Sequence, residues 1–269
     1  MKVFKRFFEL YIFANIHVAI ATWALVKISL YQFHIIDDYS PLFVFFSTIL
    51  SYNFIRLYRF KSIDSWFSHW LKNNQKILII ISSISLLGIL FTVIHISFNA
   101  LLLLIPFSFF TLFYSLPLFK QPLRTVPLLK IILIAISWAG ITVLFPLINA
   151  GISVLNWAVL GVFIQRFLFV FAITIPFDIR DITYDNKSLK TMPQLFGIAK
   201  SKYIGFLMIL GFLYINNTYL NITNIIITSI SFLGLVFARK NQNKYYAAFW
   251  IESIPIIWYI LILNQAFFT

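Results

Sequence analysis

The chain has 269 residues, of which 61% are hydrophobic and 11% are charged, and its net charge is +13. Soluble domains average about 25% charged residues, so this composition excludes an ordinary soluble protein and indicates a membrane protein. The chain contains no cysteine, which excludes disulfides, thiolate catalysis and cysteine-ligated metal sites.

Nine apolar segments follow one another along the chain, and a helix that spans a bilayer takes roughly 20 residues. We expect helices at 7–30, 41–60, 77–97, 100–118, 129–148, 154–176, 203–220, 223–238 and 246–266. A transmembrane β-barrel would instead show segments of about ten residues with alternating polarity. No soluble domain or linker interrupts the series. The sequence therefore predicts an all-α polytopic membrane protein of about nine helices, formed by a single domain over residues 1–269.

The positive charges are segregated by these segments. All but two of the 21 lysine and arginine residues lie before the first helix or around the alternate loops on the same side. The positive-inside rule makes this side, with the N-terminus, cytoplasmic. We therefore expect a multi-pass protein of the bacterial cytoplasmic (inner) membrane. Because the charges lie in short loops between spans, they indicate contact with the anionic surface of the lipid bilayer and no nucleic-acid partner.

Three of the eight acidic residues fall within "FDIRDITYDNK" (177–187), at Asp178, Asp181 and Asp185. Their spacing places them on one face of a helix, directly after a predicted span. One interpretation is a solvated helix end, whose carboxylates pair with Arg180 or nearby lysines. The other is a site for a hard divalent cation, because Mg²⁺ typically takes one or two carboxylates plus substrate phosphate oxygens. Basic loops beside it would then hold a diphosphate whose lipid tail lies among the helices.

The segment "DIRDITYDNKSLKTMPQLFG" (178–197) resembles the second aspartate-rich motif of the UbiA-type intramembrane prenyltransferases. In that motif an Asp-x-x-Asp-x-x-x-Asp run is followed by a basic residue, then by Thr-Leu-Pro and a terminal Leu-Gly. The matching positions are Asp178, Asp181, Asp185, Lys190, Thr191, Pro193 and Gly197. The segment "YSLPLFKQPLRTVPLLKIILIAISWAG" (114–140) is similar to the one that follows the fourth helix in the same family.

The resemblance implies a helix bundle around a central cavity and a Mg²⁺-dependent reaction. In the family, two aspartate-rich motifs on opposite sides of the cavity hold Mg²⁺ against a prenyl diphosphate, and the isoprenoid group passes to an acceptor. For this chain the acceptor would be a hydrophobic molecule, aromatic or lipid. The metal ligands that the resemblance implies are Asp178, Asp181 and Asp185, of which Asp181 and Asp185 are also the candidate catalytic carboxylates.

Basic residues around the loop between the fourth and fifth predicted helices are the candidates for contact with the diphosphate. They are Lys120, Arg124 and Lys130. Each also has a simpler explanation, because any lysine or arginine in this loop satisfies the positive-inside rule.

The first aspartate-rich motif of the family is degenerate here. It should lie at the end of the second helix, where this chain has "SYNFIRLYRFKSID". Asn53 is in place as a substrate-binding candidate, but the aspartate positions hold Phe54, Leu57 and Lys61.

Two hypotheses follow from this departure. In the first, Arg56 replaces a metal as a catalytic and substrate-binding residue, helped by Arg59, because arginine suits bidentate phosphate binding. In the second, the protein is a catalytically altered or inactive family member that binds isoprenoid lipids or a partner enzyme. A small-molecule transporter is a third class, but the repeat symmetry and interrupted midplane helices typical of transporters are not visible.

Two further features fall inside or beside the spans. Arg166 and Glu252 lie within predicted helices, and intramembrane charges usually face a bundle interior or a cavity. Each therefore either has a structural partner or lines a cavity, and the two could pair with each other. The segment 61–76 mixes apolar and polar residues at helical spacing, which predicts a separate interfacial helix.

Overall fold

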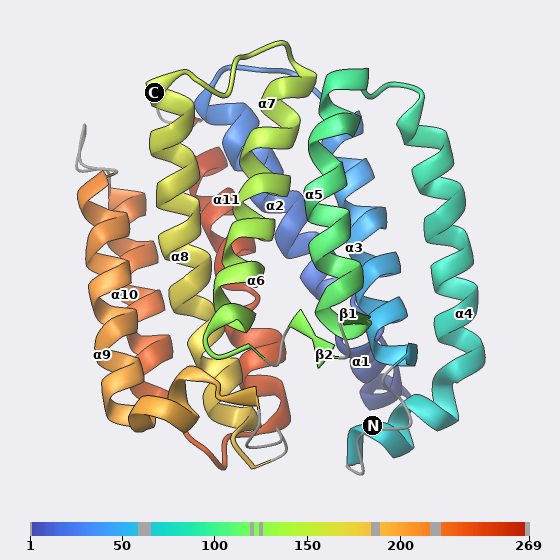
Figure 1. Ribbon diagram of the computed structural model, residues 1–269, viewed down its shortest axis with the longest axis vertical. Coiled ribbons are helices and arrows are strands. Elements are labelled where there is room, and N and C mark those ends of the chain that lie inside the picture. The colour runs from blue at the N-terminus through green and yellow to red at the C-terminus, as the bar shows by residue number, and fades with distance from the viewer. Residues whose placement is uncertain are drawn as a thin grey trace.

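The computed structural model shows a bundle of helices that stand side by side, with α4 at one edge and α9 and α10 at the other (Figure 1). The structure describes residues 2–58, 66–118, 121–123, 126–183, 189–215 and 222–266. Six helices are long and apolar enough to cross a membrane, and the bent pair α1–α2 would make a seventh span. The prediction of an all-α polytopic membrane protein is confirmed. That nine segments cross the bilayer, with the N-terminus cytoplasmic, stays a prediction.

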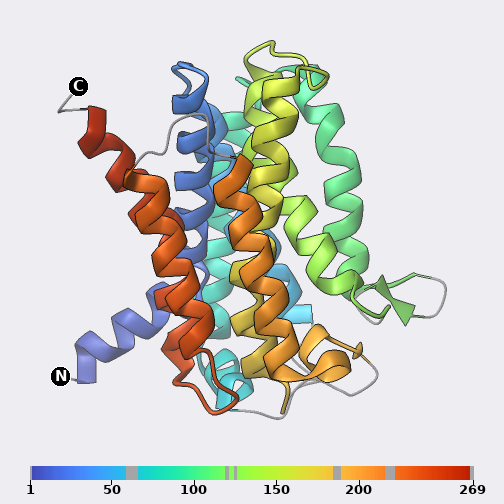
Figure 2. The same ribbon diagram turned by 90° about the vertical axis from the view of Figure 1, so that its left-hand side faces the viewer.

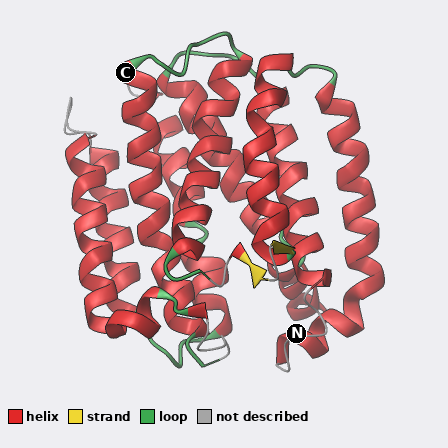
Figure 3. Cartoon of the chain, in the orientation of Figure 1, coloured by secondary structure: helices red, strands yellow, loops and turns green. Residues whose placement is uncertain are grey.

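Each predicted segment overlaps a described helix. In chain order the elements are α1 (Lys2–Phe13), α2 (Ile16–Gln32), α3 (Tyr39–Tyr58), α4 (Trp66–Val93), α5 (Phe98–Ser115), β1 (Pro117–Leu118), β2 (Gln121–Pro122), α6 (Leu129–Ala139), the π-helical turn η3 (Gly140–Leu144), α7 (Phe145–Asn149), α8 (Trp157–Asp181), α9 (Met192–Ile215), α10 (Ile222–Phe237), the π-helical turn η5 (Tyr246–Ile251) and α11 (Ile254–Ala266). The strands form a two-residue antiparallel ribbon between α5 and α6 (Figure 3).

Helix boundaries depart from the prediction at several points. The first predicted helix is bent by 50° between α1 and α2, so that α1 slants away from the bundle (Figure 2). Asn15 lies at this bend with a φ of 67°, and asparagine tolerates the left-handed region better than most residues. The described part of the interfacial helix expected at 61–76 is helical but not separate, because α4 runs unbroken from Trp66. That it lies at the membrane interface stays a prediction.

Two glycines allow local geometry that a side chain would oppose. Gly197 has a φ of +81° and interrupts α9 after its first turn, a conformation that glycine adopts without steric cost. At Gly140, the first residue of η3, an added Cβ would lie 2.0 Å from the ring of Phe107. The absence of a side chain there lets α5 and the α6–η3 segment approach closely.

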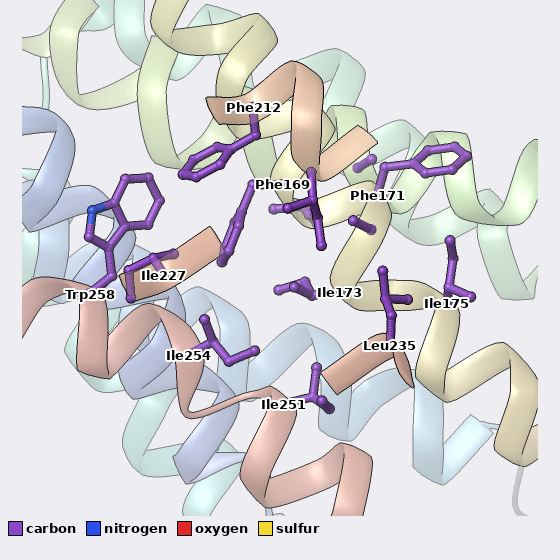
Figure 4. Close-up of a cluster of buried hydrophobic side chains, with 14 of the residues drawn as sticks. Phe169, Phe171, Ile173, Ile175, Phe212, Ile227, Leu235, Ile251, Ile254 and Trp258 are labelled. Carbon is purple, nitrogen blue, oxygen red and sulfur yellow. The ribbon is translucent and has the colours of Figure 1, made fainter. Parts of the chain in front are cut away.

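The largest buried cluster joins α2, α6, α8, α9, α10 and α11. Figure 4 shows on its left side the rings of Phe169, Phe212 and Trp258, each pair of which has centroids 5.3–5.4 Å apart. Tilted and edge-to-face rings at such distances attract each other beyond the area they bury. This cluster fixes α8 against α9 and α11, and α8 carries the acidic motif at its end.

Arg166 is completely buried in the same region. Its guanidinium donates to the Leu25 carbonyl at 2.8 Å and to the Ser29 hydroxyl at 3.2 Å, and it lies 5.1 Å from the centre of the Trp258 ring. The expected ion pair between Arg166 and Glu252 is therefore wrong. Polar atoms of α2 and a ring face stabilise this charge instead.

Candidate functional site

A cavity of about 680 Å³ lies inside the bundle. Its walls come from α2, α3, α5, α6, α8 and the η5–α11 segment. One side chain from α1 and two from α4 also line it. The charged residues that line it are Arg56, Lys130, Asp178, Arg180, Asp181, Lys240, Lys244 and Glu252. Most of them come from helix ends that meet where α3 and α8 finish and where α6 and η5 begin.

Asp178 lies in the last turn of α8 and is paired with the beginning of α6. Its Oδ1 is 2.7 Å from Nζ of Lys130, and the two side chains are only 1% and 14% exposed. A carboxylate buried this far from water is costly unless a cation compensates it. The predicted metal ligand Asp178 and the predicted diphosphate contact Lys130 thus lie together in the cavity wall, bound to each other.

Asp181 follows one turn later and is paired with its neighbour in sequence. The Arg180 guanidinium donates two hydrogen bonds to the carboxylate, from Nε to Oδ1 at 2.7 Å and from an Nη to Oδ2 at 3.1 Å. The same guanidinium lies 5.3 Å from the Phe177 ring. This pairing is the one that a solvated helix end predicts, yet Asp181 and Arg180 both line the cavity.

The carboxylates of Asp178 and Asp181 are oxygen donors of the type that Mg²⁺ takes, and two of them with substrate oxygens are a common set. Within the described ranges, no group of three or more histidine, aspartate or glutamate side chains is close enough to hold a metal ion. The third predicted ligand, Asp185, lies outside the described residues. The donors present therefore fit a site completed by substrate oxygens, and the three-aspartate set stays a prediction.

Arg56, in the last turn of α3, brings a cation to another wall of the cavity. Its guanidinium donates to the carbonyl of Phe13 in α1 and lies 5.1 Å from the centre of the Phe67 ring in α4. The side chain is half-buried and lines the cavity. Contacts with two other helices hold the guanidinium in the cavity wall.

Asn53 is not among the residues that line the cavity, and its role in substrate binding stays a prediction. It is completely buried, its Oδ1 accepts from Nδ2 of Asn15 at 2.7 Å, and its Nδ2 donates to the Ser82 hydroxyl at 3.2 Å. Asn53 therefore ties the bend after α1 to α3 and α4. The predicted contacts Arg59, Lys120 and Arg124 lie outside the described residues and stay predictions.

The loop between α10 and η5 brings further cations that the sequence did not single out, Lys240 and Lys244. Gln242 fixes this loop to α8 by donating to the Pro176 carbonyl at 3.0 Å. In the sequence these lysines satisfy the positive-inside rule like any others. Nothing in the local pattern shows that the loop turns toward the cavity.

Lys244 is oriented by α1. Its Nζ lies 2.7 Å from Oε1 of Glu9, which also accepts from the Tyr245 hydroxyl at 2.8 Å. Burial, with the hydrogen bond to Glu9, raises the pKa of Tyr245, so the phenol stays a donor at neutral pH. The position of this lysine is thereby set by a carboxylate that does not line the cavity.

The remainder of the cavity is apolar with a few hydroxyl groups. Its walls include Leu133, Ile134 and Val170, and Nε1 of Trp138 donates to the Tyr52 hydroxyl at 3.1 Å. The charged end of the cavity thus carries five cationic and three acidic side chains among the described residues, and the rest is suited to a hydrocarbon chain. Such a space can hold an amphipathic anion with its headgroup among the basic residues.

Neither the known family profiles nor the curated proteins include a match to this chain. Solved structures do resemble it. A UbiA homologue from Archaeoglobus fulgidus bound to GPP and Mg²⁺ superimposes with a TM-score of 0.63 at 14% identity, over 94% of this chain and 98% of that one. The same homologue bound to DMAPP and Mg²⁺ gives a TM-score of 0.58 at 13% identity, over 94% of each chain. A structure of a UbiA homologue from Archaeoglobus fulgidus bound to Cd²⁺ gives a TM-score of 0.56 at 15% identity, over 92% of this chain and 97% of that one. The chain therefore has the UbiA-type fold along nearly its whole length.

Proposed function

We propose that this protein is an integral membrane prenyltransferase that transfers an isoprenoid group from a prenyl diphosphate to a hydrophobic acceptor. The observation that carries the proposal is the polarity of the cavity, whose cationic end continues into an apolar interior. Arg56, Lys130 and Arg180 reach this end from three different helices. A homologue with the same fold was solved with GPP and with DMAPP, both with Mg²⁺, which supports a prenyl diphosphate as the ligand.

The basic side chains would act on the leaving group. Breaking the bond between C1 of the prenyl chain and the diphosphate oxygen leaves an electron pair, and so negative charge, on the diphosphate. Cations already fixed in place stabilise this charge without reorganising during the reaction. Asp178 fixes Lys130, and the Phe13 carbonyl with the Phe67 ring fixes Arg56.

Asp178 and Asp181, with Asp185, are the residues that would hold Mg²⁺. When bound beside the diphosphate, the ion neutralises part of its charge and favours its departure. Arg56 would supply on the α3 wall the positive charge that a metal supplies where the first motif is complete. The apolar part of the cavity would keep water from the allylic cation.

A second candidate function is the binding of isoprenoid lipids, or of a partner enzyme, without transfer. It is favoured by the loss of the first-motif aspartates and by the ion pairs that already engage Asp178 and Asp181. The two candidates make opposite predictions about bond cleavage, because a binding protein would retain prenyl diphosphate intact.

The test is an assay of diphosphate release by purified protein in lipid nanodiscs. Geranyl and dimethylallyl diphosphate would be supplied with Mg²⁺ or EDTA, with and without a panel of phenols and lipid alcohols. Asp181→Asn and Arg56→Ala should slow the release at least about tenfold, since each removes a charge-assisted contact worth about 1.5–3 kcal/mol.

Matched controls are available outside the cavity. Asp38→Asn removes an exposed carboxylate from the loop between α2 and α3, and Arg239→Ala removes an exposed guanidinium from the loop after α10. Both controls should behave as wild type. Diphosphate release that is absent, or independent of Mg²⁺ and of both site variants, would contradict the proposed transferase.

We further propose that the cationic end of the cavity faces the cytoplasm of a bacterium. The segregation of lysine and arginine supports this orientation. Since the chain has no cysteine, single cysteines at Ile36 and at Arg239 can be labelled from one side of the membrane at a time. An impermeant maleimide added to whole cells should label the first position and leave the second unlabelled.

A further inference from the structure

Glu252 lies at a break in the last membrane helix. The π-helical turn η5 ends at Ile251, and α11 begins at Ile254. The backbone N–H of Glu252 donates to the carbonyl of Ala247 at 3.3 Å, a bond that spans five residues. Such π-type turns are rare and frequently occur at functional sites. Here the break carries a half-buried carboxylate that lines the cavity.

Glu252 differs from the other carboxylates of the cavity wall. Asp178 is paired with Lys130, and Asp181 is paired with Arg180. In the part of the chain that the structure describes, the Glu252 side chain makes no hydrogen bond and no ion pair. Its oxygens therefore remain available to a molecule inside the cavity.

Ionisable groups from three elements interact electrostatically with Glu252. The guanidiniums of Arg56 in α3 and Arg180 in α8 attract the carboxylate, and the carboxylate in turn acts on the phenol of Tyr11 in α1. His17 of α2 is held nearby by the Ser253 hydroxyl at 3.1 Å. Neither arginine is within 4 Å of the Glu252 oxygens. The carboxylate thus lies beside the cations proposed to bind the diphosphate, but is separated from them.

This separation argues against a purely structural role. A carboxylate at membrane depth is costly, and one that serves only as a counter-ion should contact its partner closely. Glu252 instead leaves a gap toward both guanidiniums. In the proposed reaction, the acceptor atom must lie next to C1 of the prenyl chain, and so close to the diphosphate. The part of the cavity that Glu252 lines is such a place.

We propose that Glu252 is the group that takes the proton of the acceptor, an inference that rests on the proposed function. In this step the bond from C1 to the diphosphate oxygen breaks, and its electron pair leaves with the diphosphate. A hydroxyl oxygen or an electron-rich ring carbon of the acceptor supplies the electron pair of the new bond to C1. The proton that this atom then loses passes to the Glu252 carboxylate. No oxidant or reductant is needed.

The proposal narrows the class of acceptor. A molecule that loses a proton to a carboxylate in an apolar cavity is best matched by a phenol or an alcohol. The part of the acceptor beside Glu252 must carry no negative charge, because that charge would repel the carboxylate. A neutral hydroxylated aromatic or lipid satisfies both conditions.

The test compares Glu252→Gln and Glu252→Asp with wild type in nanodiscs containing Mg²⁺. Geranyl diphosphate is the donor, and either water alone or a panel of neutral phenols is the acceptor. General-base catalysis contributes about 10²–10⁴-fold, so Glu252→Gln should lower the single-turnover rate at least about 100-fold. Its Kd for geranyl diphosphate should stay the same or fall, because a negative charge near the ligand has been removed. Glu252→Asp, which keeps the carboxylate, should regain part of the rate.

A pH profile separates this role from a structural one. The wild-type rate should rise with pH as the carboxylate loses its proton, and Glu252→Gln should lack that rise. A Glu252→Gln rate near that of wild type would overturn the inference while leaving the proposed function intact. Equal loss of rate and of geranyl diphosphate binding, with no rescue by aspartate, would also overturn it. If wild type itself releases no diphosphate from any substrate, the proposed function fails and this inference fails with it.

Discussion

The α8 wall and the α3 wall of the cavity are built on different principles. On α8, the described carboxylates Asp178 and Asp181 are neutralised by Lys130 and Arg180. On α3, the expected aspartates are absent and Arg56 occupies the wall. The α8 wall therefore carries carboxylates that are paired with cations. The α3 wall carries a guanidinium that contacts a backbone carbonyl and an aromatic ring. The difference is one of charge, because the α8 wall brings two paired carboxylates to the cavity and the α3 wall brings a guanidinium.

The largest expected effect lies on the α8 wall. Asp178→Ala would leave the Lys130 ammonium buried without its partner, and removing one member of a buried ion pair costs about 3–5 kcal/mol. The free energy of unfolding, measured by denaturant titration in mixed micelles, should fall by that amount. The double variant Asp178→Ala with Lys130→Met should regain part of it. If the single variant is as stable as wild type, the pair is not a structural element of this wall.

The next effect lies on the α3 wall and concerns binding more than stability. Arg56→Ala should weaken geranyl diphosphate binding by about 1.5–3 kcal/mol, the value of a hydrogen bond to a charged group. Arg56→Lys keeps the charge but loses the bidentate fork, so its loss should be smaller. Isothermal titration calorimetry measures both. Equal affinities for all three proteins would show that this wall takes no part in diphosphate binding.

Asn53 should affect stability alone. Asn53→Ala leaves the buried amide of Asn15 without its acceptor, which costs about 1–3 kcal/mol in unfolding free energy. The affinity for geranyl diphosphate should not change, because Asn53 does not line the cavity. A variant of normal stability with weakened binding would restore Asn53 as a substrate contact.

The smallest expected effect concerns the loop that closes the site beside α8. Gln242→Ala removes the hydrogen bond to the Pro176 carbonyl, and one such bond contributes about 0.5–1.5 kcal/mol. Hydrogen exchange at Lys240 and Lys244 should become faster, with a small loss of geranyl diphosphate affinity. Unchanged exchange would mean that the loop is held by other contacts.

Much of the fold follows from the sequence for a simple reason. The bilayer requires apolar helices of a certain length, and the positive charges lie in every second loop between them. Both patterns are local, so they can be recognised in the sequence. The bend at Asn15, the π-helical turns and the unbroken start of α4 depend on packing between distant segments, which no local pattern records. The acidic motif was found because Asp178 and Asp181 are close in sequence. Lys244 and Glu252 reach the cavity only through the tertiary arrangement of the last helix.

Asn53 shows the opposite case. Its place in the degenerate motif matched the family, but in the structure its amide is consumed by Asn15 and Ser82. A motif position predicts a residue's role only while the surrounding motif is intact. The contacts of Asn53 with Asn15 and Ser82 join distant segments, so the sequence could not show them.

The central claim is that the cationic end of this cavity recognises a diphosphate while the interior takes its hydrocarbon chain. The most direct measurement is the equilibrium binding of geranyl diphosphate, geraniol and inorganic diphosphate to wild type and to Arg56→Ala. Geranyl diphosphate should bind wild type more tightly than either fragment, and Arg56→Ala should lose affinity for the two diphosphates but not for geraniol. Equal affinity of wild type for geraniol and geranyl diphosphate would contradict it.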